Sequence, residues 1–166
     1  MYFRYHESPT GELLLAGDES GLQMLYMDIE RRGYPEADWQ PAIRQFDEHC
    51  RQLDRYFEGR LKRFDLLLAP RGTPFQQEVW KALLEIPYGR TTSYSELAER
   101  IGKPKSVRAV GTANGANPIS IIIPCHRVIG RDGSLTGYAG GLSRKALLLK
   151  LEGVRLQPEQ DQLLLV

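Results

Sequence analysis

Cysteine, histidine and long apolar runs are all scarce in this chain. It has 166 residues, of which two are cysteine and three are histidine, and these show no zinc-ligand spacing, so we expect no structural metal. No apolar run approaches the roughly 18 residues needed to cross a bilayer, and residues 1–7 lack the apolar segment of a signal peptide. We therefore expect a soluble protein of the reducing cytoplasm with no membrane partner.

The chain does contain enough apolar material for a core, and its charge is unevenly distributed. Hydrophobic residues make up 42% of it, which suits one large domain or two small ones. The net charge is only +1, yet residues 1–70 carry 9 Lys and Arg against 13 Asp and Glu, whereas residues 71–150 carry 12 against 5. A solvated basic face would explain this bias, and so would a polyanionic partner such as nucleic acid.

The first 70 residues alternate short apolar runs with turn signals. Residues 2–28 read as a small antiparallel meander, on which we expect a helix over 41–58 to pack. A strand-like run at 64–68 follows, and the Pro- and Gly-rich residues 70–74 predict a boundary.

From residue 75 the pattern becomes helical. We expect helices over 75–84, 93–101 and 105–115, with Thr73 or Pro74 starting the first and Ser93 or Ser95 capping the second. The last two are short and joined by a glycine-containing turn, which is a helix-turn-helix pattern.

Together these elements predict an α+β fold in two domains. The first, residues 1–70, is a small antiparallel sheet with a packed helix, and the second, residues 73–153, is mostly helical and winged-helix-like. Residues 154–166 form a C-terminal tail.

The third expected helix has unusually small side chains, because after Arg108 it reads Ala-Val-Gly-Thr-Ala-Asn-Gly-Ala. Glycine weakens a helix by up to about 1 kcal/mol, so Gly111 and Gly115 need a reason. Tight packing against another helix is one. The other is that a nearly bare helix can press its backbone into a groove of duplex DNA, with little sequence preference.

Cys125 and His126 form the most chemically suggestive pair. They follow the apolar, strand-like run 119–123, and Pro124 would end strand pairing there, so we expect the pair on an exposed loop. A thiol attacks as thiolate, and a neighbouring imidazole can lower its pKa from about 8.5 towards neutrality. The alternative is that Cys125 is a small buried hydrophobe, as most free cysteines are.

Cys50 also has a histidine neighbour, His49, and serves as a comparison. It lies on a stripe of apolar residues spaced three and four apart, so packing on a helix face accounts for it. The stripe consists of Ile43, Phe46, Cys50, Leu53 and Phe57.

The motifs from residue 73 to 153 resemble those of the O6-alkylguanine-DNA alkyltransferases, the methylated-DNA–protein-cysteine methyltransferases that repair alkylated guanine directly. The matching segments run in register and include the specific block Pro-Cys-His-Arg-Val at 124–128. The others are 75–80, 109–111, 117–118, 137–141 and 151–153. The first 70 residues resemble the family in layout only.

The resemblance implies roles for single residues. Cys125 is the acceptor thiol, His126 is the base that deprotonates it through a bridging water, and Glu152 orients that histidine, with the logic of a hydrolase triad. Tyr94 assists flipping and hydrogen-bonds the base, and Arg108 fills the space that the flipped nucleotide leaves. Without the resemblance, Glu152 and Arg108 would be solvated charges and Tyr94 a core tyrosine.

The remaining implied residues surround this centre. Asn117 is the hinge that ties the recognition helix to the active-site segment. The other DNA-binding residues of the helix are Ala109, Thr112, Ala113 and Asn114, and the wall of the guanine pocket includes Val128, Tyr138 and Ala139.

The implied chemistry is an in-line displacement at the alkyl carbon on guanine O6 that needs no cofactor and leaves a permanent thioether, so each molecule acts once. O4-alkylthymine is a second candidate substrate. The partner is alkylated double-stranded DNA, and the protein is expected to act as a monomer, without an obligate protein partner.

Two rival functions remain. One is a lesion-binding module of the alkyltransferase-like kind, which lacks the nucleophilic cysteine. The other is a thiol hydrolase or acyltransferase that uses Cys125 and His126 and turns over.

Overall fold

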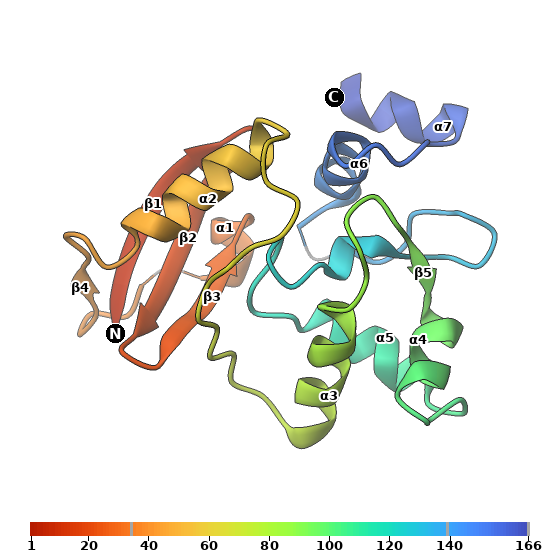
Figure 1. The fold of residues 1–166 in the computed structure, drawn as a ribbon, viewed down its shortest axis with the longest axis horizontal. Helices are drawn as coiled ribbons and strands as arrows, with labels where there is room; N and C mark the ends of the chain where they lie inside the picture. The colour runs from red at the N-terminus through yellow and green to blue at the C-terminus, as the bar shows by residue number, and fades with distance from the viewer. Residues whose placement is uncertain (34, 139, 166) are drawn as a thin grey trace. The chain divides into compact units, whose positions relative to one another are not determined.

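The structure, a computed structural model, describes residues 1–33, 35–138 and 140–165. It divides into two compact units, the first made of Met1–Arg71 with Pro118–Ser120 and the second of Gly72–Asn117 with Ile121–Val166 (Figure 1). Residues 154–165, expected as a separate tail, fold as part of the second unit.

The first unit is built on a four-stranded sheet of order β3-β2-β1-β4. The antiparallel meander predicted over residues 2–28 is confirmed, because β1 (Tyr2–Ser8), β2 (Gly11–Asp18) and β3 (Gly21–Tyr26) pair in sequence. The short β4 (Gln40–Pro41) runs parallel to β1, and the helical turn α1 (Ile29–Arg32) follows β3.

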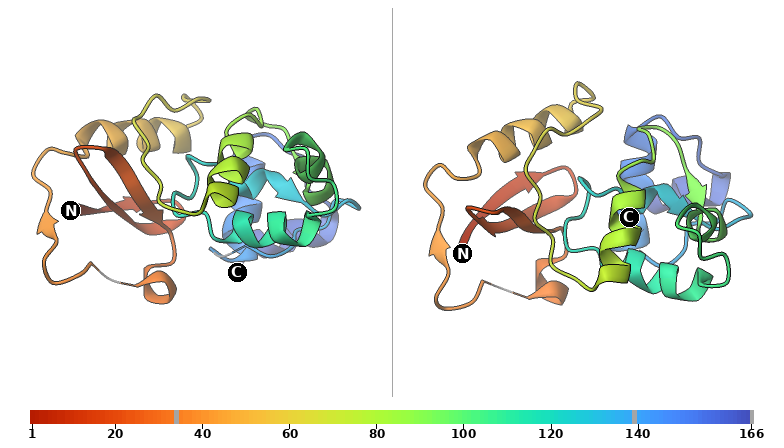
Figure 2. Two further views of the ribbon diagram at one scale, coloured as in Figure 1. Left: turned by 90° about the horizontal axis from the view of Figure 1, so that it is seen from below. Right: turned by 60° about the horizontal axis from the view of Figure 1, so that its bottom comes forward.

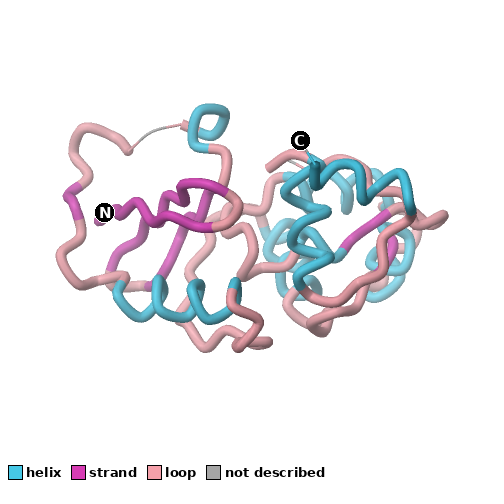
Figure 3. Tube along the Cα trace, turned by 90° about the horizontal axis from the view of Figure 1, so that it is seen from above, coloured by secondary structure: helices cyan, strands magenta, loops and turns pink. Residues whose placement is uncertain are grey.

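Helix α2 (Asp47–Phe57) lies along one face of this sheet (Figures 1 and 3). The predicted start at residue 41 is wrong, since Ile43 lies before the helix with 84% of its surface exposed. Asp47 and Glu48 open the helix, where carboxylates favour the positive end of the helix dipole. Cys50 and Leu53 are buried in the core, as predicted.

The strand predicted at 64–68 is also wrong, apart from one bridge between Leu22 and Leu68. The backbone of Asp65 bonds a side chain instead of a neighbouring strand. Its N–H donates to Gln52 Oε1 at 2.9 Å, and its carbonyl accepts from Gln52 Nε2 at 3.1 Å. A buried glutamine on α2 therefore satisfies polar groups that the sequence pattern assigns to a sheet.

The second unit is mostly helical, as predicted (Figure 2). The three predicted helices are confirmed as α3 (Pro74–Leu83), α4 (Tyr94–Arg100) and α5 (Val107–Gly115), and α5 packs against both others. Thr73 caps α3 with a reciprocal capping box, and Ser93 Oγ accepts from Glu96 N to cap α4.

The rest of the second unit follows the candidate nucleophile. A 3₁₀ turn, Cys125–Arg127, leads into β6 (Val128–Ile129), which pairs in parallel with β5 (Thr92–Ser93). A loop then leads to α6 (Leu142–Leu151), and α7 (Pro158–Asp161) with the 3₁₀ turn Gln162–Leu165 ends the described chain.

The apolar run 119–123 is not the predicted strand. Only Ile119 forms a bridge, to Leu25, and residues 120–123 turn, with Ile121 at a φ of +73°. The run is divided between the units, because Pro118–Ser120 bonds β3 and the rest enters the second unit. All of 119–123 is buried, and full burial produces an apolar run whether or not the backbone is extended.

Candidate active site and nucleic-acid interface

Cys125 opens the 3₁₀ turn and is buried, with 5% of its surface exposed. The exposed loop predicted for it is therefore wrong. The turn is closed by hydrogen bonds from Cys125 N to Ile123 O at 2.8 Å and from Arg127 N to Pro124 O at 3.0 Å. Cys50 is equally buried, at 4%, so exposure does not distinguish the two thiols. Any difference in their reactivity must come from the groups around them.

The end of α5 holds this turn in place. Asn117 Nδ2 donates to Ile123 O at 2.8 Å, and Asn114 Nδ2 donates to Cys125 O at 3.5 Å. Both asparagines are buried, as is Ala113, whose carbonyl accepts from Trp80 Nε1 at 2.9 Å. The side chain of Asn114 thus points to the backbone of Cys125, which contradicts its predicted place on the DNA-binding face.

His126 and Glu152 form a fully buried pair, with His126 Nε2 2.7 Å from Glu152 Oε2. Arg127 completes the cluster, since its Nε donates to Glu152 Oε1 at 2.8 Å and its Nη2 to Oε2 at 3.1 Å. The Gly89 N–H also donates to the carboxylate, at 3.2 Å. Glu152 is thus a buried carboxylate whose negative charge is balanced by Arg127. Its remaining hydrogen-bonding capacity is used to hold His126.

This arrangement fixes the state of the imidazole. Burial lowers the pKa of His126, and the hydrogen bond to Glu152 opposes that effect without reversing it, so the ring is neutral near pH 7. A neutral imidazole bonded to a carboxylate through Nε2 carries its proton there, which leaves the lone pair on Nδ1. Nδ1 is buried and has no hydrogen-bond partner within the described ranges, so it is available to accept a proton.

Lys145, on the buried face of α6, is a functional candidate that the sequence analysis missed. Its ammonium donates to Val128 O at 2.6 Å and Thr136 O at 3.0 Å, and burial lowers its pKa to about 8. The charge of Cys125 opposes this shift, so the ammonium and a Cys125 thiolate stabilise each other. Burial raises the pKa of Cys50, and there the charge of Arg4, which lowers it, is opposed by the carboxylates of Asp54 and Asp47.

Arg127 was missed as well, although it sits inside the most specific sequence block. A signal for Lys145 was present, since it lies three and four residues before the buried Leu148 and Leu149 and therefore shares their face. No comparable signal exists for Arg127, because its partner lies 25 residues away.

The predicted pocket residues lie near these groups. Val128 is buried in β6, and Tyr138 is 8% exposed, with Lys145 Nζ 5.8 Å from its ring centre. Tyr94, in the first turn of α4, donates its hydroxyl to Thr136 O at 3.4 Å. Ala139 lies outside the described residues.

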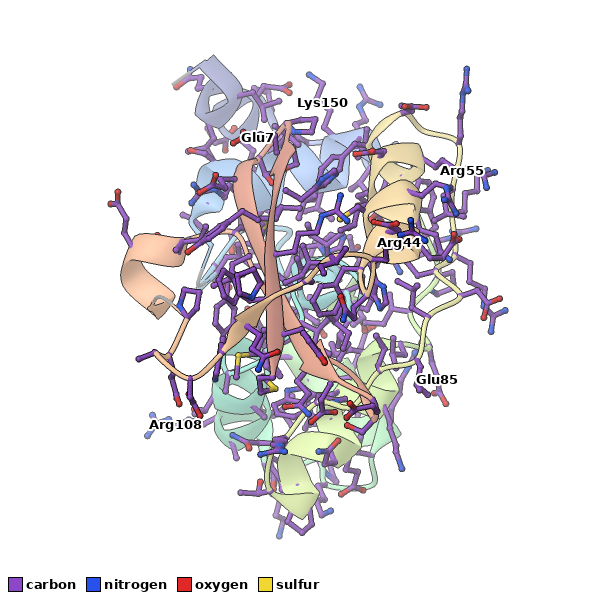
Figure 4. The ribbon with its side chains drawn as sticks, turned by 90° about the vertical axis from the view of Figure 1, so that its left-hand side faces the viewer. Glu7, Arg44, Arg55, Glu85, Arg108 and Lys150 are labelled. Atoms are coloured by element: carbon purple, nitrogen blue, oxygen red, sulfur yellow. The ribbon has the colours of Figure 1, made fainter. Side chains whose placement is uncertain are left out.

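The outer side of α5 is exposed and basic at its start. Arg108, Ala109 and Thr112 are exposed, and Figure 4 shows the Arg108 side chain directed away from the helix. They line an open hollow of about 660 Å³ together with the start of α3. The other lining residues are Thr73, Phe75, Gln76, Lys105, Ser106 and Ala113.

Crowding does not explain the two glycines of α5. A Cβ at Gly111 would lie 3.7 Å from the ring of Tyr94, an ordinary contact, and one at Gly115 would meet no described atom within 4 Å. Packing within the protein therefore does not require glycine at either position. This favours the alternative, a bare helix surface that allows close approach to another molecule.

The described residues include neither a metal-binding cluster nor a membrane-spanning helix. No three His, Cys, Asp or Glu side chains gather where they could hold a metal ion, and no helix is long and apolar enough to cross a membrane.

Comparisons with known proteins match both parts of the chain. The family model described as "6-O-methylguanine DNA methyltransferase, DNA binding domain" matches residues 74–154, and the "ribonuclease-like domain" of the same family matches residues 1–70. The methylated-DNA–protein-cysteine methyltransferase of Methanosarcina barkeri is 58% identical over 92% of this chain and 97% of its own. The Mycobacterium tuberculosis protein of that name is 52% identical over 93% and 94%. Among solved structures, Mycobacterium tuberculosis OGT in complex with DNA superposes with a TM-score of 0.88, at 51% identity over 99% of both chains.

Proposed function

Because the chain belongs to the 6-O-methylguanine DNA methyltransferase family, we propose that it repairs duplex DNA by transferring the alkyl group from guanine O6 to its own Cys125. The observation that carries this proposal is that Cys125 shares one 3₁₀ turn with His126, whose imidazole bonds the buried Glu152, in a chain 58% identical to a named methyltransferase. The protein acts without a cofactor, as a cytoplasmic monomer.

The reaction begins with the thiol proton. His126 Nδ1 accepts it, directly or through a bridging water, while Glu152 holds the ring and stabilises the imidazolium. The thiolate attacks the alkyl carbon in line with the bond to O6, so an S–C bond forms as the C–O6 bond breaks. Guanine leaves with that electron pair, and the Tyr94 hydroxyl donates to a ring nitrogen as the charge develops.

DNA is bound through α4 and α5, acting as a helix-turn-helix. The exposed Arg108 enters the base stack at the place that the damaged nucleotide has left. The glycines and alanines of α5 let the backbone of this helix approach the groove. Phosphate contacts dominate, so binding to undamaged duplex is sensitive to salt and nearly indifferent to sequence.

Weighing the intact protein tests this function against a thiol hydrolase. After incubation with excess duplex containing one O6-methylguanine, the mass should rise by one methyl group, about 14 Da, and then stay constant, because a thioether resists the attack by water that releases a thioester. Continued product formation beyond one equivalent would contradict the proposal.

Arg108→Ala should lower the repair rate on duplex DNA about 30-fold or more, and the rate on free modified guanine less than twofold. The reason is that extruding a base costs a few kcal/mol, which the arginine offsets only when there is a stack to fill. Single-turnover kinetics on the two substrates measure this difference. Arg55→Ala on α2 removes the same charge from the first unit (Figure 4) and should leave both rates unchanged. Equal losses on both substrates in the Arg108 variant would remove it from the flipping role.

A further inference from the structure

The loop after β6 has little regular structure of its own. We call residues 130–138 the pocket loop, because it joins Val128 to Tyr138. Its internal backbone bonds form one turn, with Gly130 N donating to Ser134 O at 2.8 Å and Gly133 N to Gly130 O at 2.9 Å. A loop with so few bonds takes its conformation from whatever contacts it from outside.

Two glutamines of the C-terminal segment supply such contacts. Gln160 Nε2 donates to Gly133 O at 2.8 Å, and Gln157 Nε2 donates to Asp132 O at 3.2 Å. Gln160 is 7% exposed, so its amide depends on protein acceptors, and without Gly133 O its nitrogen would keep only the longer bond to Gln157 Oε1, at 3.5 Å. The fit is close at the turn, since a Cβ on Gly133, whose φ is +86°, would lie 2.9 Å from Gln157 Nε2.

The segment is built to present these donors. Gln160 Oε1 accepts from Gln157 N at 2.9 Å, which caps the short helix α7, while the nitrogen of the same amide bonds the loop. The amide of Gln160 therefore caps its own helix through its oxygen and bonds the pocket loop through its nitrogen. A separate ion pair between Lys150 and Asp161, 3.1 Å apart and half-exposed, joins α6 to α7 without touching the loop. Figure 4 shows Lys150 near the surface.

We propose that α7 is a clasp that holds the pocket loop in its base-receiving conformation, with Gln157 and Gln160 as positioning residues. This inference rests on the proposed function. Lys145 bonds the carbonyls of Val128 and Thr136 and so holds the loop towards its two ends, and the clasp holds the turn between them. With the loop already ordered, the ordering cost is not incurred when the flipped base arrives. The clasp should therefore act on base binding, with little effect on the displacement step.

Gln160→Glu tests the clasp, since it keeps the oxygen that caps α7 and removes the donor to Gly133. Because the added charge is buried and could disturb folding, Gln157→Glu at the exposed neighbour is a second, milder variant. Asp161→Asn is the matched control, because it breaks the ion pair to α6 and leaves the loop contacts intact. Thermal melting confirms that each variant is folded.

Two measurements are made on each protein. The first is hydrogen exchange of the backbone amides of residues 131–137 without DNA, which should become about fivefold faster in each glutamine variant, the effect of losing one neutral hydrogen bond. The second is single-turnover repair of duplex carrying O6-methylguanine, with protein in excess over DNA. The half-saturating protein concentration should rise about fivefold while the limiting rate changes less than twofold. The control should match the wild type in both.

Unchanged exchange in both glutamine variants would overturn the clasp, as would a fall in the limiting rate at a constant half-saturating concentration. The exchange measurement needs no substrate, so it tests the clasp even if wild-type protein fails to gain a methyl group. That failure would count against the proposed function instead.

Discussion

Cys125→Ala is expected to abolish alkyl transfer and to leave DNA binding intact. The thiolate is the only group proposed to bond the alkyl carbon, and alanine has no atom to replace it. The helix proposed to approach DNA, α5, does not include residue 125, so affinity for a duplex containing O6-methylguanine should change by less than about threefold. Intact-protein mass and a gel-shift titration measure the two properties on the same samples.

Cys50→Ala is the matched control for this result. Cys50 is 4% exposed in the core of the first unit, where burial disfavours its thiolate and raises its pKa despite the nearby charge of Arg4. Its variant should gain one methyl group at the wild-type rate and lose about 1–2 kcal/mol in the free energy of unfolding, from a small cavity. Peptide mapping should find the label on Cys125. A label on Cys50, or transfer by Cys125→Ala, would overturn the assignment of the nucleophile.

The helices of the second unit could be predicted from sequence because their signals are local. Thr73 with Gln76, and Ser93 before Glu96, satisfy the first N–H groups of α3 and α4 within three residues. The wrong predictions concern segments whose conformation depends on residues far away in the sequence. The run 64–68 looks like a strand because it is apolar, yet the Gln52 side chain takes up backbone bonds that a sheet would supply. That contact joins residues 13 apart and leaves no mark on the local pattern.

In the active site, too, local features could be predicted from sequence and long-range contacts could not. Cys125 and His126 stand out as neighbours, and the family resemblance pointed to Glu152, which the structure places 2.7 Å from His126. The resemblance did not show that Arg127 shares the carboxylate or that the charge of Lys145 interacts with that of Cys125. Buried charges are stable only when paired, so each such partner is fixed by tertiary structure. The burial of Asn114, predicted to face DNA, likewise depends on how the end of α5 meets the Cys125 turn.

Glu152→Gln should be the most disruptive conservative change in the protein. The carboxylate is fully buried and accepts hydrogen bonds from His126, Arg127 and the Gly89 N–H. An amide replaces one of its two acceptor oxygens by a donor and leaves the Arg127 charge buried without a counter-ion. Breaking a buried pair in this way costs about 3–5 kcal/mol, so we expect the free energy of unfolding to fall by that amount in a denaturant titration. Glu78→Gln, which removes a half-exposed partner of Lys103, should cost less than about 1 kcal/mol.

The same substitution should slow alkyl transfer and move its pH dependence. Both effects of Glu152 on His126, the hydrogen bond and the charge, raise the pKa of that imidazole against the effect of burial. Without them the pKa falls further, and Nδ1 becomes a weaker base for the thiol proton. The rate of methyl transfer should then drop about 10- to 100-fold near pH 7 and recover as the pH rises and the thiol loses its proton to solvent. Because a merely unstable protein would lose activity without such recovery, rates measured from pH 6 to 9 on folded protein separate the two effects. An unchanged profile would mean that another carboxylate supports His126.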